Sequence, residues 1–282
     1  MRKKLVAVVI AFALLLVLGV SVYAITDGAY LGEIGMFAFD FTPSRFARVD
    51  GATYNTSFNT MLFSLLGTRF GGNGVTTFGL PNLTPYTPYG GEYLHYDIAT
   101  SGLYPQYEGG AQEHHVTGEI KLFPYERLAG STWIRCNGAA LPAASSPMLV
   151  ACIGNRFGSD SAGMFNVPDL RAVEPEGMYY YICAEDGNGF FTMGEMKLLA
   201  GSETFYNDRY SGSLSPCRGQ SMLIINHMAL YSLIGSNYGG DGTTTFALPT
   251  TSGTYGTANN LLNPLPGLEY YIVTLGSYPS RS

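Results

Sequence analysis

The sequence predicts a β-rich α+β protein made of three tandem units, each combining short strands with one short helix and a Gly-rich loop. Three observations support this fold class. One block of the sequence recurs three times without a gap. The chain contains 36 glycines, while charged residues make up only 13% of it, against a usual share of roughly 25%. The apolar runs that suit helices are too short to be stable alone, so they must pack against strands.

The first segment, residues 1–24, is predicted to be a signal peptide outside the fold. Basic residues from Arg2 to Lys4 precede an uncharged apolar run from Leu5 to Val22, and Val22 and Ala24 supply small residues at the −3 and −1 positions of a cleavage site. The apolar run is also long enough to span a bilayer, so an uncleaved anchor is the alternative. In both cases we expect the rest of the chain to be exported.

The repeated block defines the three units. Residues 49–81 align with 136–168 and with 217–249, and five columns hold the same residue in every copy. These structural repeat positions are Gly51, Gly67, Gly71, Phe78 and Pro81 in the first copy, Gly138, Gly154, Gly158, Phe165 and Pro168 in the second, and Gly219, Gly235, Gly239, Phe246 and Pro249 in the third. The alignment predicts units at residues 25–115, 116–191 and 192–282.

Each unit is expected to begin with a strand at a Gly-Glu-Ile or Gly-Glu-Met triplet and to continue with a strand that ends at the first repeated glycine. One short helix follows. The predicted helices cover residues 60–66, 148–153 and 227–234, with N-caps at Asn59, Ser146 and Asn226. Pro147 suits the first helical position, and the second repeated glycine is expected to end each helix in the left-handed conformation.

A Gly-rich loop and a further strand come after the helix. Asn73-Gly74 and Asp241-Gly242 in these loops are tight-turn dipeptides, because both residues of each pair tolerate positive φ. Units two and three close with aromatic strands at 179–183 and 270–273, and unit one has a weaker match at 93–96.

These motifs resemble the phage tail collar domain and the microcystin-dependent proteins of bacteria. The resemblance is carried by Gly-Glu-Ile, by the run from Leu62 to Gly74, and by Thr-Thr-Phe-Gly-Leu-Pro at 76–81; unit three is similarly close and unit two is divergent. It implies a structural role, because in phages such domains belong to short tail fibres that assemble as trimers and touch the host surface. A signal segment and three copies in one chain favour an exported cellular relative over a virion component.

Three copies in one chain also predict an arrangement. Each unit alone buries a limited core, so we expect the three to pack around a pseudo-threefold axis and to imitate a trimer within one polypeptide. The competing arrangement is three independently folded units in a row.

The four cysteines, Cys136, Cys152, Cys183 and Cys217, occupy columns that are apolar in sister copies. We therefore expect free thiols in the core. A single bridge from Cys136 to Cys183 is the alternative for an exported chain.

The sequence offers no catalytic or cofactor motif, so we predict a non-enzymatic chain without cofactor or metal. His114 and His115 form a lone cluster and are assigned to a solvated linker, because a tetrahedral metal site needs further ligands. The Gly-rich loops lack the spaced carboxylates of a calcium site, so turn chemistry explains them. Glu33, Glu119 and Glu195 recur at the same strand start and are expected to cap or pair locally.

The predicted function is a structural or adhesive role in a secreted or cell-surface protein. Its expected partners are copies of itself, a cell surface or a glycan, with membrane contact only if the N-terminal segment is not cleaved. A formal net charge of −6 argues against nucleic-acid binding. The alternatives are a soluble glycan-binding module with tyrosine-lined loops and a prophage-derived particle component. Tyrosines crowd unit one at Tyr86, Tyr89, Tyr93, Tyr96, Tyr104 and Tyr107, although core and strand-edge packing also explains them.

Overall fold

The computed structural model describes residues 29–84, 94–105, 115–126, 132–159, 161–187, 191–210, 212–251 and 267–281. The predicted signal peptide lies outside the described residues. Within these ranges, no helix combines the length and the apolar character needed to cross a membrane.

Unit one follows the predicted order of elements. They are β1 (Ile34–Phe37), β2 (Phe46–Arg48), β3 (Thr53–Asn55), α2 (Thr60–Leu66), β4 (Thr77–Gly79) and β5 (His95–Ala99). β5 pairs with both β1 and β2, whereas β3 and β4 form a separate hairpin beside α2. Tyr96 lies opposite Met36, so unit one has a closing strand that extends beyond the sequence match at 93–96.

Unit two repeats this plan. Its elements are β6 (Glu119–Phe123), β7 (Trp133–Arg135), β8 (Ala140–Pro142), η2 (Ala143–Ser145), α3 (Pro147–Ile153), β9 (Met164–Asn166), η3 (Arg171–Val173) and β10 (Tyr179–Cys183). β10 pairs with β6 and β7, and the hairpin of β8 and β9 again lies apart from them.

Unit three repeats it with one addition. Its elements are β11 (Glu195–Leu199), α4 (Glu203–Arg209), β12 (Leu214–Pro216), β13 (Ser221–Leu223), η4 (Ile224–Asn226), α5 (Met228–Ile234), β14 (Thr245–Ala247) and β15 (Glu269–Val273). The sequence analysis did not identify α4, although it carries local helix signals. Ser202 caps it by accepting a hydrogen bond from the amide of Phe205 at 3.2 Å, and Glu203 and Arg209 complement the helix dipole at its two ends.

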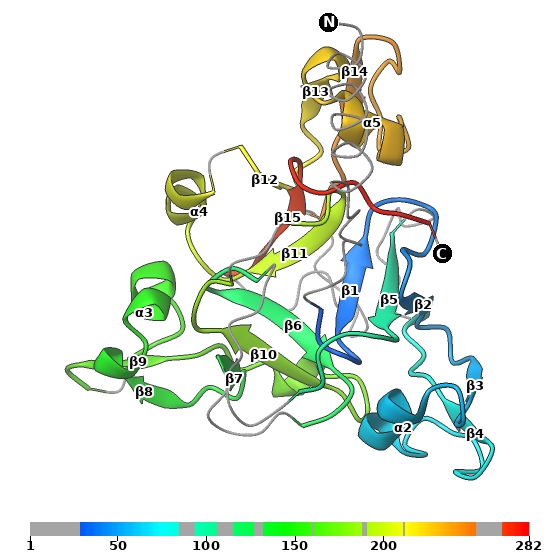
Figure 1. Cartoon of the computed structure of the whole chain (residues 1–282). Coiled ribbons are helices and arrows are strands. Elements are labelled where there is room, and N and C mark those ends of the chain that lie inside the picture. Colours follow the sequence, from blue (N-terminus) through cyan, green and yellow to red (C-terminus); the bar gives the residue numbers. More distant parts are fainter. Residues whose placement is uncertain are drawn as a thin grey trace, which may run out of the picture.

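The first strands of the three units meet at the centre of the molecule (Figure 1). Ile34 of β1 lies opposite Leu122 of β6. The equivalent pairs are Ile120 with Leu198 between β6 and β11, and Met196 with Met36 between β11 and β1. Each strand therefore pairs with both others in the same register, which is the signature of a threefold axis. The pseudo-threefold arrangement predicted from the repeat is confirmed, and the row of independent units is wrong.

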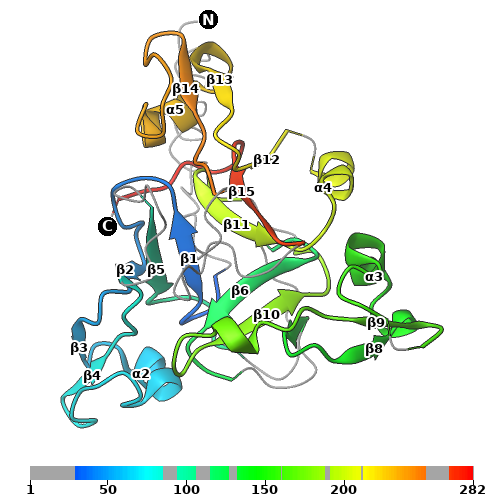
Figure 2. The same ribbon diagram turned by 180° about the vertical axis from the view of Figure 1, so that it is seen from behind.

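Three lobes project from this centre, as the view from behind also shows (Figure 2). We define the lobes as residues 51–80, 138–167 and 219–248, each containing one hairpin and one short helix. Each lobe contacts the next unit at the same place. Arg69 donates to the carbonyl of Pro124 at 2.7 Å, Arg156 to that of Ala200 at 2.6 Å, and the Tyr238 hydroxyl to that of Ala38 at 2.9 Å. These cyclic contacts fix the lobes to the ring.

The C-terminal segment closes the ring between units three and one. Arg281 forms an antiparallel bridge with Pro43, and the amide of Ser44 donates to the carbonyl of Ser280 at 3.0 Å. The Arg281 guanidinium also lies 4.7 Å from the centroid of the Phe41 ring, which adds a cation–π contact.

The glycine of each Gly-Glu triplet is required by packing between units. Gly32, Gly118 and Gly194 have φ of 79°, 82° and 81°, in the region that favours glycine. A Cβ at Gly32 would lie 2.8 Å from the ring of Tyr125 in unit two, and a Cβ at Gly194 would lie 2.8 Å from Phe39 in unit one. These glycines thus admit an aromatic ring of a neighbouring unit.

The predicted helices are correct to within a residue, but their caps differ from the prediction. The third helix begins at Met228, so its N-cap is His227 and not Asn226. Asn59 and Ser146 are N-caps but make no capping hydrogen bond through their side chains. Gly154 ends its helix with φ 53° and ψ −136°, so φ is positive as expected while ψ departs from the left-handed helical value.

Candidate functional site

The fifteen repeat positions build the lobes and lie outside the centre of the ring. The first and last are hydrogen-bonded in every copy: the amides of Gly51, Gly138 and Gly219 donate to the carbonyls of Pro81, Pro168 and Pro249 at 3.0–3.2 Å. Gly71, Gly158 and Gly239 accept from the strand that follows the loop. The phenylalanines are the core of each lobe, with Phe78, Phe165 and Phe246 at most 1% exposed. Gly67, Gly154 and Gly235 end the helices.

The Gly-rich loops are held by turn chemistry, as predicted. Asp241 Oδ1 accepts from the amides of Thr243, Thr244 and Thr245 at 2.7–2.8 Å. These bonds, with that from the Thr244 hydroxyl first in weight, hold the pKa of Asp241 well below its usual range. Asn73 makes the same contacts in lobe one. Asp160, the corresponding acid of lobe two, lies outside the described residues.

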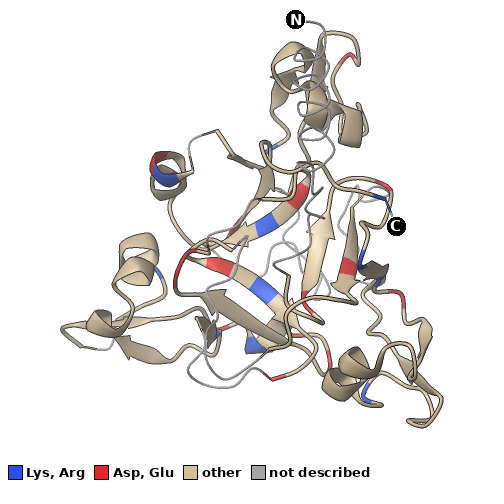
Figure 3. Cartoon of the chain, in the orientation of Figure 1, with Lys and Arg blue, Asp and Glu red and all other residues tan. Residues whose placement is uncertain are grey.

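The strongest candidate site is a buried charge cluster on the pseudo-threefold axis. Glu33, Glu119 and Glu195 stand one residue before or at the start of the central strands, and all three are buried. The next strand position facing the axis is Lys121 in unit two, Lys197 in unit three and Gly35 in unit one. Figure 3 shows these central charges on β6 and β11, whereas the lobes carry few charged side chains.

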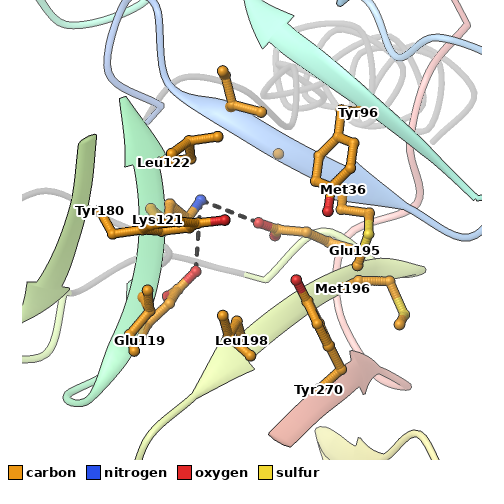
Figure 4. A pocket seen from close by; sticks show the side chains of 13 residues that line it. Met36, Tyr96, Glu119, Lys121, Leu122, Tyr180, Glu195, Met196, Leu198 and Tyr270 are labelled. Atoms are coloured by element: carbon orange, nitrogen blue, oxygen red, sulfur yellow. Dashed lines mark hydrogen bonds and ion pairs between the residues drawn. The ribbon is translucent and has the colours of Figure 1, made fainter. Parts of the chain in front are cut away.

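Each lysine binds the glutamate of the preceding unit. Lys197 Nζ lies 2.9 Å from Glu119 Oε1, and Lys121 Nζ binds Glu33. Both ammonium groups also lie 3.3 Å from Glu195 Oε1, the glutamate whose own lysine position is Gly35. Figure 4 shows the carboxylates of Glu119 and Glu195 reaching Lys121 from two different strands. The cluster therefore joins all three units.

The ion pairs decide the charge states of the cluster. Burial alone would raise the pKa of Glu119, but Lys197 and Lys121 outweigh it and hold that pKa well below its usual range. Burial would likewise lower the pKa of Lys121, yet Glu33, Glu195 and Glu119 raise it well above its usual value. The pKa of Glu33 is lowered because Lys121 and His115 outweigh its burial. These groups stay charged across the neutral range.

The predicted local pairing of the glutamates is also present. Glu33 Oε2 accepts from the amide of Tyr30 at 3.2 Å, and Glu119 Oε2 accepts from that of Val116 at 3.0 Å. Sequence reasoning found this part of the site. It missed the convergence on the axis and the two lysines, although their spacing two residues after Glu119 and Glu195 was visible.

The assignment of His115 to a solvated linker is wrong. His115 is 4% exposed, because it lies between Tyr30 of unit one and Trp133 of unit two. Its Nε2 lies 3.5 Å from Glu33 Oε2 and its Nδ1 lies 3.8 Å from Glu119 Oε2. A polar residue next to a predicted linker thus became part of the charged core. His114 lies outside the described residues.

A small cavity of about 40 Å³ adjoins the charge cluster. Three equivalent tyrosines, Tyr96, Tyr180 and Tyr270, line it together with Gly35 and Glu195 (Figure 4). Burial raises the pKa of Tyr96 and that of Tyr270. The volume admits water but no organic substrate, and within the described ranges no group of three or more His, Cys, Asp or Glu side chains could hold a metal ion.

The cysteines are free and buried, as predicted, and the alternative bridge does not form. Cys183 lies opposite Trp133, whereas the amide of Cys136 bonds to the carbonyl of Tyr180 farther along the same strand. Burial raises the pKa of Cys152 to about 11 and raises those of the other three thiols as well. The thiolate fraction at neutral pH is therefore small, and the thiols are unreactive in the fold.

Apolar side chains are exposed on two of the three lobes. Phe58 is 88% exposed and Met61 53% in lobe one; Ile225 is 77% exposed and Met228 66% in lobe three. Lobe two differs, because the residues aligned with these are small or polar or less exposed: Ala144, Ser145, Pro147 and Met148. The lobes therefore share a framework but present different surfaces.

Three α+β units, closed into a ring by their first strands and lacking an assembled catalytic constellation among the described residues, define a scaffold protein. The model of the phage tail collar domain matches residues 32–88, 118–175 and 210–255, together more than half of the chain. The chain belongs to the phage tail collar domain family, which is a structural family of phage tails. No curated protein and no solved structure is matched by this chain.

Proposed function

We propose that this chain is an exported, non-enzymatic protein with a structural or adhesive role at the cell surface or outside the cell. The observation that supports it most is the closure of three collar units from one chain into a ring with three outward lobes. A single-chain ring needs no assembly partner to complete its core, so the lobes are free to make contacts.

Export rests on the N-terminal segment. The basic residues, the apolar run and the ending at Ala24 are those of a signal peptide. N-terminal sequencing of the protein recovered from medium, wall and membrane fractions tests this, and we expect a mature chain that begins at Ile25. A chain that still begins at Met1 and sediments with membranes contradicts cleavage and identifies an anchor.

Contact is proposed to run through the exposed apolar side chains of lobes one and three. Burial of such side chains against another surface removes apolar area from water and stabilises the contact. The proposed partners are a second copy of the chain or a cell-surface glycan. Phe58→Ser and Ile225→Ala introduce the residues that lobe two has at the aligned positions, Ser145 and Ala144.

We expect these two variants to weaken self-association in sedimentation velocity and binding to cells, while the melting temperature stays unchanged because both side chains are exposed. Ser145→Ala in lobe two is the matched control and should change neither. Unchanged association and unchanged cell binding in both variants would remove the lobes from the proposal.

A prophage-derived particle component is the second candidate, and the family itself favours it. The two candidates separate by the state of the native protein, since a particle component is recovered with assembled particles whereas an exported protein is recovered alone. The glycan-binding alternative gains no support from the described tyrosines of unit one: Tyr96 lines the axial cavity and the Tyr104 hydroxyl lies 3.0 Å from that of Ser64. A glycan array with the mature chain tests it directly.

A further inference from the structure

The axial cluster has three carboxylates but only two ammonium groups, and the position of a third lysine is Gly35. Buried charges are stable only when they are paired. One further positive charge is therefore needed for balance. Among the described residues that contact Glu33 and Glu119, the remaining titratable nitrogen base is His115.

The geometry of His115 fits a cation. Both ring nitrogens face carboxylate oxygens, Nε2 toward Glu33 at 3.5 Å and Nδ1 toward Glu119 at 3.8 Å. A neutral imidazole has one N–H and one lone pair, so it would direct the lone pair at a negative oxygen on one side. An imidazolium has an N–H on both sides and attracts both carboxylates.

The aromatic neighbours of His115 favour the same state. The Tyr30 ring is stacked on the imidazole with a centroid distance of 5.8 Å and an interplanar angle of 8°. A cation over an aromatic face is attracted by the negative charge of that face. Trp133 closes the other approach at 4.8 Å, edge to face.

We propose that protonated His115 is the third cation of the axis and acts as a pH-sensitive link between units one and two. Glu33 and Tyr30 belong to unit one, whereas His115, Glu119 and Trp133 belong to unit two. The residues at the equivalent places of the other units are Ala29 and Phe191, so this link exists once in the ring. Loss of the proton leaves an unbalanced negative charge at this contact and weakens it.

The neighbouring groups isolate the effect to the neutral and alkaline range. The pKa values of Glu33 and Glu119 are lowered and that of Lys121 is raised, so these partners keep their charges between about pH 6 and pH 9. A group whose charged, protonated form is favoured by the fold stabilises it at low pH. That stabilisation is lost as the pH rises and the proton leaves.

The direct test is nitrogen NMR of the ¹⁵N-histidine-labelled protein at about pH 7.5, with His115 assigned by the signal missing in His115→Gln. We expect two protonated ring nitrogens with similar shifts. One protonated and one unprotonated nitrogen would overturn the proposal, and this reading of the wild-type chain stands even if the variant folds poorly.

The second test compares melting temperatures of the wild type and His115→Gln from about pH 6 to pH 9. We expect the advantage of the wild type to shrink by roughly 2–4 °C or more as the pH rises. His227→Gln, in lobe three and away from the axis, is the matched control and should give a constant difference. A constant difference for His115→Gln as well would refute the link.

Discussion

Replacement of Lys197 by Met removes one charge from the axis and keeps most of the side-chain volume. Lys197 has no exposed side-chain surface, and its ammonium group lies 2.9 Å from Glu119 and 3.3 Å from Glu195. Glu119 would keep only Lys121, at 3.6 Å, and His115 as cationic neighbours. Breaking a buried pair in this way costs about 3–5 kcal/mol, because the remaining charge is left uncompensated.

For a chain of this size we expect Lys197→Met to lower the melting temperature by roughly 6–20 °C. Calorimetry and urea titration of the mature chain measure the loss. Arg171→Met is the matched control, since Arg171 pairs with Asp169 on the surface, where the two side chains are 61% and 47% exposed. It should leave the melting temperature unchanged.

The double variant Lys197→Met with Glu119→Gln separates charge from packing. Because a neutral amide needs no counter-charge, it should recover part of the stability lost in Lys197→Met. The reasoning fails if Lys197→Met melts with the surface control, or if the double variant is less stable than the two single losses combined.

Three further predictions follow from the ring. Because the pKa of Glu119 is lowered in the fold, its contribution is fully present above about pH 4.3, its unfolded value, and is lost as the pH falls below it; acid titration of Lys197→Met should therefore show a shallower loss than that of the wild type. Gly32→Ala should destabilise more than Gly163→Ala by thermal melting, because both glycines have positive φ but only Gly32 faces a ring at 2.8 Å; equal losses would exclude the packing argument. The melting temperature should be the same with and without reductant, and native thiols should resist alkylation, since all four cysteines are buried and free; a fall on reduction would reveal a bridge.

The sequence by itself determined the units and their local structure. Its gapless repeat located the strands, the short helices and the loops, because caps, glycines and apolar spacing act between residues close in the chain. The repeat also placed each cysteine in an apolar column, which correctly predicted buried thiols. It predicted a ring on the general ground that a small unit needs a neighbour to cover it.

Only the tertiary structure decided what lies on the axis. Glu33, Glu119 and Glu195 are far apart in the chain, and each looked like a local cap until the first strands paired in one cyclic register. His115 appeared to belong to a linker, because nothing near it in the sequence shows that two carboxylates from different units will face its ring. Closure brings such groups together, and their burial then makes the pairing of charges decisive, because an unpaired charge that is harmless in water is costly in the core.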